Sequence, residues 1–186
     1  MDNLTLTGDP TRIAALGALA ELFGALRMEY ALVGEIALAA WLGEPVGNSG
    51  PVDLLALIQT DRSRQIPMMA TSRGFTVDED EARRGEELDL LPMTWVGGDR
   101  PVRVHVLFAT NALYGRMVRD AVTASAAGAT MKVVAAEDLA LLLLVSELPD
   151  AAATIGRLRL ELGTTFDRDG LNRKLVSIGL QGKVLV

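Results

Sequence analysis

The segment from Val52 to Ile58 constrains the fold more than any other part of the chain. It reads Val-Asp-Leu-Leu-Ala-Leu-Ile, a short apolar run in which Asp53 is the only polar side chain. Runs of this length that are rich in Val, Leu and Ile, and that follow a cluster of turn residues, are typical of β-strands. The preceding stretch, Gly43 to Pro51, is dense in Gly, Pro and Asn and indicates a loop. The chain therefore contains a strand that begins with a carboxylate directly after a glycine-rich loop.

Helical and strand patterns flank this strand on both sides. Asp9 and Pro10 indicate the start of a helix, because apolar residues recur after them at helical spacing up to Leu26. An acidic run at 78–81 is expected to be a solvated turn. The other expected elements are, in order, a strand at 29–33, a helix at 35–42, a helix at 63–73, a strand at 75–77, a hairpin of strands at 90–96 and 102–108, a helix at 112–121, a strand at 130–134, and helices at 137–147, 149–162 and 170–178.

These elements predict an α/β (α+β) protein, with a mixed sheet backed by helices and a helical C-terminal third. No repeat, low-complexity tract or linker divides the 186 residues, and this length suits one or two domains. We therefore expect a single domain over residues 1–186. Within it, residues 1–110 would form the sheet core, and residues 111–186 would form a mainly helical part packed on that core.

Composition excludes several classes of functional site. The chain has no cysteine, which rules out disulfides, thiolate nucleophiles and cysteine-based metal sites. It has one histidine, His105, so a metal site built from several histidines is ruled out as well. The formal net charge of −6 argues against a general nucleic-acid surface or an anionic-membrane surface. The N-terminus lacks the pattern of a signal peptide, and the apolar run Leu139 to Val145 is too short to span a bilayer, so we expect a cytoplasmic protein.

The order of three features resembles the minimal nucleotidyltransferases and the abortive-infection toxin proteins of the polymerase-β-like superfamily. A strand ends at Gly34 where a helix begins, a strand carrying Asp53 follows the glycine-rich loop, and a later strand carries His105. In those families a Gly-Gly or Gly-Ser turn opens the helix, an Asp-x-Asp strand follows, and a third Asp lies on a neighbouring strand. The resemblance covers about residues 31–178 and includes two later motifs, Glu137-Asp138-Leu139 and Leu148-Pro149-Asp150.

The resemblance implies where the substrate and the metal ions of such an enzyme would lie. Nucleotidyl transfer uses two Mg²⁺ ions held by carboxylates, and two Asp at i and i+2 on a strand point to the same face. The nucleotide would lie against the glycine turn, where a helix N-terminus favours an anion. The family pattern thereby gives Asp53 the remaining catalytic and metal-binding position and His105 the position of the third carboxylate. We expect four residues to contact a bound nucleotide: Gly34, Glu35, Ser49 and Arg103.

The sequence departs from the family pattern at most of these positions. Pro51 stands where the first Asp is expected and His105 where the third is expected, and histidine is a poor ligand for Mg²⁺. Glu35 places an acid at the second residue of the glycine turn, where its carboxylate could occupy the helix N-terminus and repel a triphosphate. A Lys expected after Glu137-Asp138-Leu139 is absent, and Thr154 stands at an expected second acid. These departures predict loss of the two-metal reaction, so no cofactor is expected, and Mg²⁺ is the expected cofactor if the protein is active.

Two interpretations of Asp53 follow from this pattern. It could pair with Arg103 or His105 as a partly buried ion pair that holds the cleft together, or it could keep a role in binding a ligand or a single metal ion. Glu87 and Asp89 form another carboxylate pair at i and i+2 and could replace the missing ligands. The same two residues are also explained as an exposed strand edge protected by charge.

Three functions are compatible with the sequence. The leading hypothesis is a nucleotidyltransferase-fold protein without transferase activity that acts as a nucleotide-binding, regulatory or partner-binding module. The first alternative is an active, divergent, metal-dependent nucleotidyltransferase that modifies an RNA, a protein or a small-molecule acceptor. The second is the structural half of a toxin–antitoxin-like pair in a bacterium. The apolar run Leu139 to Leu144 fits a fully buried helix or a contact within a homo-oligomer.

Overall fold

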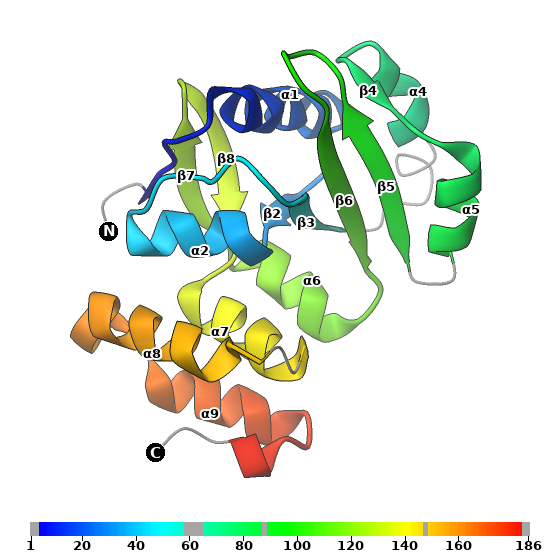
Figure 1. Cartoon of the computed structure of the whole chain (residues 1–186). Coiled ribbons are helices and arrows are strands. Elements are labelled where there is room, and N and C mark those ends of the chain that lie inside the picture. Colours follow the sequence, from blue (N-terminus) through cyan, green and yellow to red (C-terminus); the bar gives the residue numbers. More distant parts are fainter. Residues whose placement is uncertain (1–3, 58–64, 87–88, 147–148, 184–186) are drawn as a thin grey trace. The chain divides into compact units, whose positions relative to one another are not determined.

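The computed structural model of the chain describes residues 4–57, 65–86, 89–146 and 149–183 (Figure 1). The described residues fall into two compact units, one within residues 1–134 and one within residues 135–186. The first unit holds the sheet and the second is helical. The expected single domain with a division near residue 110 stays a prediction.

The first unit is built on one mixed, eight-stranded sheet. Its strands are β1 (Leu4–Thr5), β2 (Tyr30–Leu32), β3 (Val52–Leu57), β4 (Phe75–Thr76), β5 (Leu90–Trp95), β6 (Val102–Ala109), β7 (Val122–Ala126) and β8 (Ala129–Val133). They lie in the order β1-β7-β8-β2-β3-β6-β5-β4. At the centre, β3 pairs in parallel with β6 and antiparallel with β2, and β5 and β6 form the expected hairpin. The mixed sheet with its helices confirms the predicted fold class.

Five described helices belong to the first unit: α1 (Pro10–Leu26), α2 (Gly34–Leu42), α4 (Ile66–Thr71), α5 (Glu79–Glu86) and α6 (Ala112–Arg119). Figure 1 shows α1, α2 and α6 gathered around the central strands, and both α2 and α6 pack on β3. Part of the helix expected at 63–73 lies outside the described residues. Helices α2 and α6 therefore both contact β3, the strand that carries Asp53.

The start of α1 follows directly from its sequence. Asp9 caps the helix by accepting a hydrogen bond from the backbone N–H of Arg12 at 2.9 Å, and Pro10 occupies the first turn. The buried face of α1 is mostly aliphatic, with Leu16 and Leu19 both at most 1% exposed. Arg12 lies on this buried face and is itself only 1% exposed, so a charged residue is part of the interior at the helix start.

Two sequence-based expectations for this unit were wrong. The acidic run at 78–81 is not a turn but the beginning of α5, because Asp78 caps the helix through a 2.8 Å bond from the N–H of Glu81 and acidic residues are favourable near a helix N-terminus. Strand β7 was not expected, since its five residues include Ala124, Ser125 and Ala126, which have low strand propensity. Pairing with β8 through a tight turn overrides this propensity.

The second unit consists of α7 (Ala136–Ser146), α8 (Ala151–Leu162), α9 (Arg168–Ser177) and two short 3₁₀ turns (Gly163–Thr165 and Gln181–Lys183). Asp167 caps α9 by accepting a 2.8 Å hydrogen bond from the N–H of Gly170. Lys174 on α9 pairs with Asp138 on α7, whose side chain is 2% exposed. This ion pair links α9 to α7 within the helical unit. In the described ranges, no helix is both long and apolar enough to cross a membrane.

Candidate functional site

Asp53 and His105 lie side by side on the two central parallel strands. The register of β3 and β6 places Asp53 opposite His105, and partners at such positions project from the same face of the sheet. The His105 Nδ1 and Asp53 Oδ1 atoms are 2.9 Å apart, and the side chains are 32% and 30% exposed. The two atoms are at hydrogen-bond distance, and the donor in this bond is set by the tautomer of His105 and by the protonation of Asp53. His105 is therefore the partner of Asp53, as one of the two sequence-based pairings predicted.

Gly34 provides the space for the Asp53 carboxylate. A Cβ atom at position 34 would lie 3.0 Å from Oδ2 of Asp53, and the backbone of Gly34 has a positive φ of 62°. Both the close approach and the left-handed backbone favour glycine. The N–H of Val33 donates to the carbonyl of Asp53 at 2.9 Å and fixes the two strands at this point. The carboxylate of Asp53 thus lies against the first residue of α2.

The environment of Asp53 favours its protonated form. Burial raises the pKa of the Asp53 carboxyl above its usual value, while His105 and Arg12 oppose this rise and the carboxylate of Glu35 adds to it. A carboxyl group whose pKa is raised holds its proton more tightly, and a metal ion must compete with that proton. The surroundings of Asp53 therefore weaken it as a ligand for a divalent cation.

A buried arginine that the sequence analysis missed organises the glycine-rich loop. The guanidinium of Arg12 donates to three carbonyl oxygens: Gly47 at 3.1 Å, Ser49 at 2.6 Å and Pro51 at 2.8 Å. Its Nε atom has no hydrogen-bond partner among the described residues. Arg12 has the helical spacing of the apolar face of α1, four residues before Leu16, and this spacing is the signal by which it could have been found. One side chain of α1 therefore fixes the loop that leads into Asp53.

Glu35 does not occupy the N-terminus of α2, contrary to the expectation from the sequence. Its Oε1 atom lies 3.4 Å from Nη1 of Arg12, and no side chain caps α2. The Glu35 carboxylate also lies over the loop, within 3.1 Å of a Cβ built at Gly47 and within 2.9 Å of one built at Gly50. Glu35 is attracted towards the buried guanidinium because the ion pair compensates a charge that water cannot reach.

A small cavity lies beside the loop and is lined by three arginines. Its volume is about 290 Å³, and its lining includes Arg12, Ser49, Pro51, Arg100 and Arg103. Among the described residues that line it there is no Asp or Glu. Two residues that were expected to bind a nucleotide, Ser49 and Arg103, are therefore brought together here.

The arginines of this cavity each have a carboxylate partner outside its lining. Arg100 pairs with Asp9 and donates to the carbonyl of Asn48. Arg103 does not pair with Asp53, as one sequence-based interpretation proposed, but with Glu81 of α5 at 3.1 Å. Arg103 is two residues before His105 on β6, and the hairpin brings α5 close to it. The Asp53–His105 pair thus does not line the arginine-lined cavity, although it lies close to it along β3 and β6.

The side chains around Asp53 do not fit a pair of magnesium ions. Mg²⁺ prefers carboxylate and water oxygens in octahedral geometry, whereas Pro51 offers no side-chain ligand and Oδ1 of Asp53 is bonded to His105. No group of three or more His, Asp or Glu side chains suited to a metal ion occurs within the described ranges. Glu87 lies outside those ranges. Asp89 lies within them, exposed, with a positive φ of 52° in the turn directly before β5.

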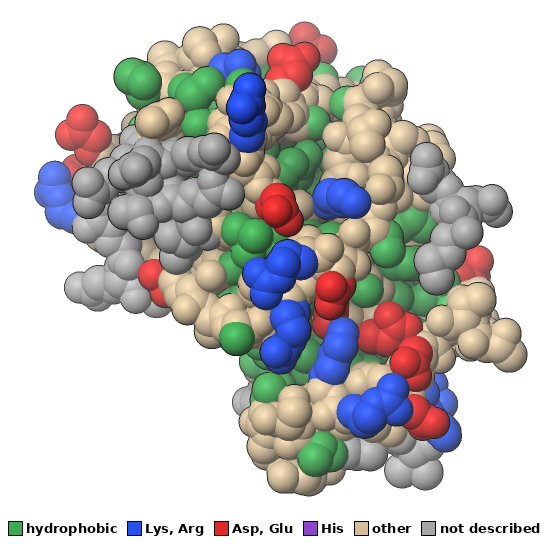
Figure 2. Space-filling model, turned by 180° about the vertical axis from the view of Figure 1, so that it is seen from behind, with side chains coloured by type: hydrophobic (Ala, Val, Ile, Leu, Met, Phe, Trp, Pro, Cys, Tyr) green, Lys and Arg blue, Asp and Glu red, His purple; other side chains and the backbone are tan. Residues whose placement is uncertain are grey.

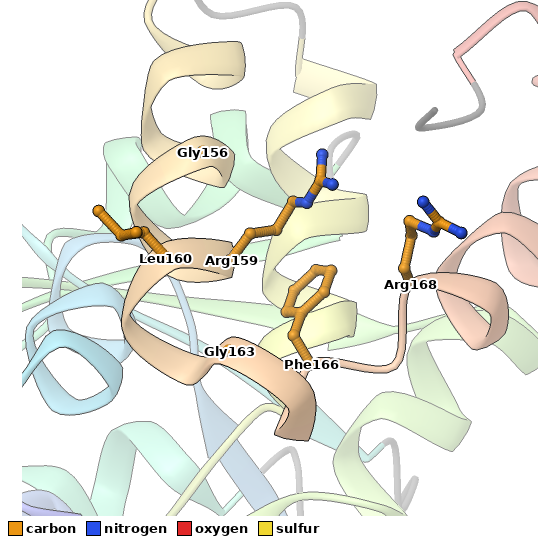
Figure 3. Close-up of a pocket in the computed structure, with 6 residues that line it drawn as sticks. All are labelled: Gly156, Arg159, Leu160, Gly163, Phe166 and Arg168. Carbon is orange, nitrogen blue, oxygen red and sulfur yellow. The ribbon is translucent and has the colours of Figure 1, made fainter.

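The helical unit has a cavity of its own. It has a volume of about 500 Å³ and is lined by Gly156, Arg159, Leu160, Gly163, Phe166 and Arg168. Figure 3 shows the side chains of Arg159 and Arg168 on either side of the Phe166 ring, with Leu160 pointing away from them. Leu160 is 85% exposed, whereas Phe166 is 7% exposed. The cavity combines apolar surface with positive charge.

Charged side chains of both signs are interspersed on one face of the molecule. Figure 2 shows Lys and Arg side chains lying next to Asp and Glu side chains on the face that it displays. The net charge of −6 is therefore accompanied by local pairs of opposite charge on that face. On the face that Figure 2 displays, the described side chains of opposite charge thus lie close together.

Comparisons with known proteins identify the fold. No family model and no curated protein sequence matches the chain. Solved structures do match. A solution structure of the antibiotic-resistance factor ANT(2'')-Ia has a TM-score of 0.57 at 16% identity, covering 91% of this chain and 94% of that one. A crystal structure of ANT(2'')-Ia in complex with adenylyl-2''-tobramycin has a TM-score of 0.55 at 16% identity, covering 90% and 98%.

A third similar structure is an antigenic nucleotidyltransferase-like protein from Paracoccidioides brasiliensis. Its TM-score is 0.54 at 13% identity, and the match covers 96% of this chain and 95% of that one. At these identities the similarity concerns the fold and not the residues of the site. The chain has a nucleotidyltransferase-like fold, as the order of motifs in its sequence predicted.

Proposed function

We propose that this protein keeps the nucleotidyltransferase fold without the two-metal transfer reaction, and that it acts as a binding or regulatory module for a nucleotide or a protein partner. The observation that carries the proposal is the hydrogen bond between Asp53 and His105 on the neighbouring strands β3 and β6. In a two-metal reaction the carboxylate oxygens bind the metal ions. Here one oxygen is bonded to an imidazole and the other lies against Gly34.

The loop before Asp53 supports the same proposal. A phosphate-binding loop presents backbone N–H groups and positive charge to its ligand. In this chain, Arg12 binds the carbonyls of the loop from below, and Glu35 places a negative charge over Gly47 and Gly50. A triphosphate approaching the start of α2 would meet that carboxylate. Binding of a nucleotide in the usual transferase position is therefore disfavoured by charge.

A transfer assay tests the proposal directly. The protein is incubated with each of four α-labelled NTPs, with Mg²⁺ or Mn²⁺, and with RNA or protein acceptors, and covalent labelling is measured. We expect no labelling above that of a heat-denatured control. Labelling that disappears in Asp53→Ala but persists in Asp80→Ala, a change at an exposed acid of α5, would show that the protein is an active transferase and that the proposal is wrong.

The second part of the proposal is that the protein binds a protein partner in the cytoplasm. Large apolar side chains are exposed in the helical unit, including Leu160 at 85% and Val176 at 50%, and such residues are where a partner would gain most from burial. Light scattering of the purified protein and co-purification from its source cells test this part. A monomeric mass together with no co-purifying protein would contradict it and would also count against a toxin–antitoxin-like pair.

A further inference from the structure

We infer that the cavity between the glycine-rich loop and the turn before β6 binds a phosphoryl group through arginines and without a metal ion. This inference rests on the proposed function, because it supplies positive charge from the protein at a site where metal ions would otherwise supply it. The ligand class is a phosphate monoester or inorganic phosphate. The volume of about 290 Å³ suits a small ligand or one end of a larger one.

The lining of the cavity has the chemistry of an anion site. Arg12, Arg100 and Arg103 all line it, and no acidic side chain of the described residues does. A guanidinium presents several N–H donors in a planar fork that matches the oxygens of a phosphoryl group. Ser49 adds a hydroxyl group to the same lining. Three arginines are thus gathered in one small cavity of a chain whose net charge is −6.

The buried arginine is the strongest sign that the cavity is a built site. Arg12 is 1% exposed, and its Nε atom has no hydrogen-bond partner among the described residues. Its Nη atoms already donate to the loop carbonyls, so Arg12 contributes buried positive charge beside the cavity, which an anion in the cavity would offset in part. Glu35 compensates that charge only in part, because it is half exposed and 3.4 Å away.

Arg103 can turn to a ligand at little cost. Its side chain is 66% exposed, and its pair with Glu81 is a surface ion pair. Pairs of this kind contribute little to stability because water solvates both partners. A phosphoryl group carries more charge than a single carboxylate at neutral pH, so it competes well for the guanidinium. Arg103 is therefore the residue that closes the site from the solvent side.

The inference is tested by calorimetric titration of the full chain with sodium phosphate, AMP and ATP, each in EDTA and then in Mg²⁺. We expect binding in EDTA that Mg²⁺ does not strengthen and that weakens as KCl is added. The comparison of phosphate with AMP distinguishes the contribution of the phosphoryl group from that of the nucleoside, because AMP will bind more tightly than phosphate only if the protein also contacts the nucleoside. No binding of any of the three ligands, or binding that requires Mg²⁺, would overturn the inference.

Variants identify the residues. Arg103→Gln should weaken phosphate binding about tenfold or more, since a hydrogen bond to a charged group is lost, and Arg103→Lys should restore part of it. Arg116→Gln, at an exposed arginine of α6, is the matched control and should bind as the wild type does. An equal loss in Arg103→Gln and Arg116→Gln would mean that phosphate binds by general charge, and would overturn the assignment.

Transfer activity alongside binding in EDTA would refute the proposed function alone, whereas no transfer and no binding would refute this inference alone.

Discussion

Replacement of Arg12 by methionine should destabilise the sheet unit by about 3 kcal/mol, because removing one partner from a buried ionic network is strongly destabilising. The carbonyls of Gly47, Ser49 and Pro51 each lose a donor. Because these residues are exposed or half-buried, water replaces part of each bond, and the net loss is about 1 kcal/mol for each bond. Glu35 contributes little to the loss, because its side chain is 50% exposed and water can solvate it. Removal of the buried charge and of the unpartnered Nε offsets part of the total.

This loss is large compared with the whole stability of a protein, which is about 5–15 kcal/mol. For a chain of this size it corresponds to a decrease in Tm of about 6–12 °C. Urea unfolding followed by tryptophan fluorescence measures it in the relevant part of the chain, because both tryptophans, Trp41 and Trp95, lie within residues 1–134. Arg116→Met, at an exposed position on α6, is the matched control and should stay within about 0.5 kcal/mol of the wild type.

The loop provides a second measurement. If Arg12 fixes the loop, Arg12→Met should also weaken phosphate binding in the neighbouring cavity, whereas Glu35→Gln should cost less than about 1 kcal/mol in stability. A loss in Arg12→Met no greater than that of the Arg116→Met control would show that other contacts hold the loop. The reasoning from buried hydrogen bonds would then be wrong.

Three other perturbations give separable outcomes. Burial raises the pKa of Tyr30 to about 12, so native stability should fall as pH rises from about 10 towards 12, and Tyr30→Phe should remove that part of the fall. At pH 7 the same substitution should raise stability by about 1 kcal/mol, because the buried hydroxyl has no partner among the described residues. The pKa of Asp53 is raised by burial, so the folded state holds the proton more tightly, and Asp53→Asn should gain stability relative to the wild type as pH rises above 3.8; a difference that does not change with pH would contradict this. Gly8→Ala should destabilise by more than about 1 kcal/mol in thermal unfolding, since φ is 126° and a Cβ would lie 2.4 Å from the backbone of Val46, whereas Gly17→Ala, with open space around it in α1, should be neutral or stabilising.

The parts of the fold that sequence reasoning predicted carry strong local signals. The apolar run that became β3, the glycine turn between β5 and β6, and the Asp9-Pro10 start of α1 each combine a pattern with a boundary residue. Strand β7 carries no such signal, because its small residues form a strand only when β8 is beside them. The acidic run was misjudged because charge indicates exposure but does not distinguish a turn from a capped helix.

The candidate site was predictable only where its residues share a strand pattern. Alternation along β3 and β6 places Asp53 and His105 on faces that can meet, and the register brings them into contact. Arg12 was not predicted, because its partners in the loop are 35 to 39 residues away in sequence, and no local pattern reports such a separation. The pairing of Arg103 with Glu81 depends on α5, because Glu81 lies in that helix. A turn was expected from the sequence at residues 78–81, so this pair was not predicted.

The contact between Arg12 and the loop also bears on the order in which the site forms during folding. Closing a loop of nearly 40 residues costs chain entropy before the contact can repay it, so the carbonyls of Gly47 and Ser49 can engage the guanidinium only after α1 has docked on the sheet. A fragment beginning at β2 would retain Asp53, His105 and the whole loop, yet it would lack the group that sets the shape of the loop. We therefore expect the glycine-rich loop to be among the last parts of this unit to become ordered. In a fragment that lacks α1, the loop should be the first part to lose its ordered conformation.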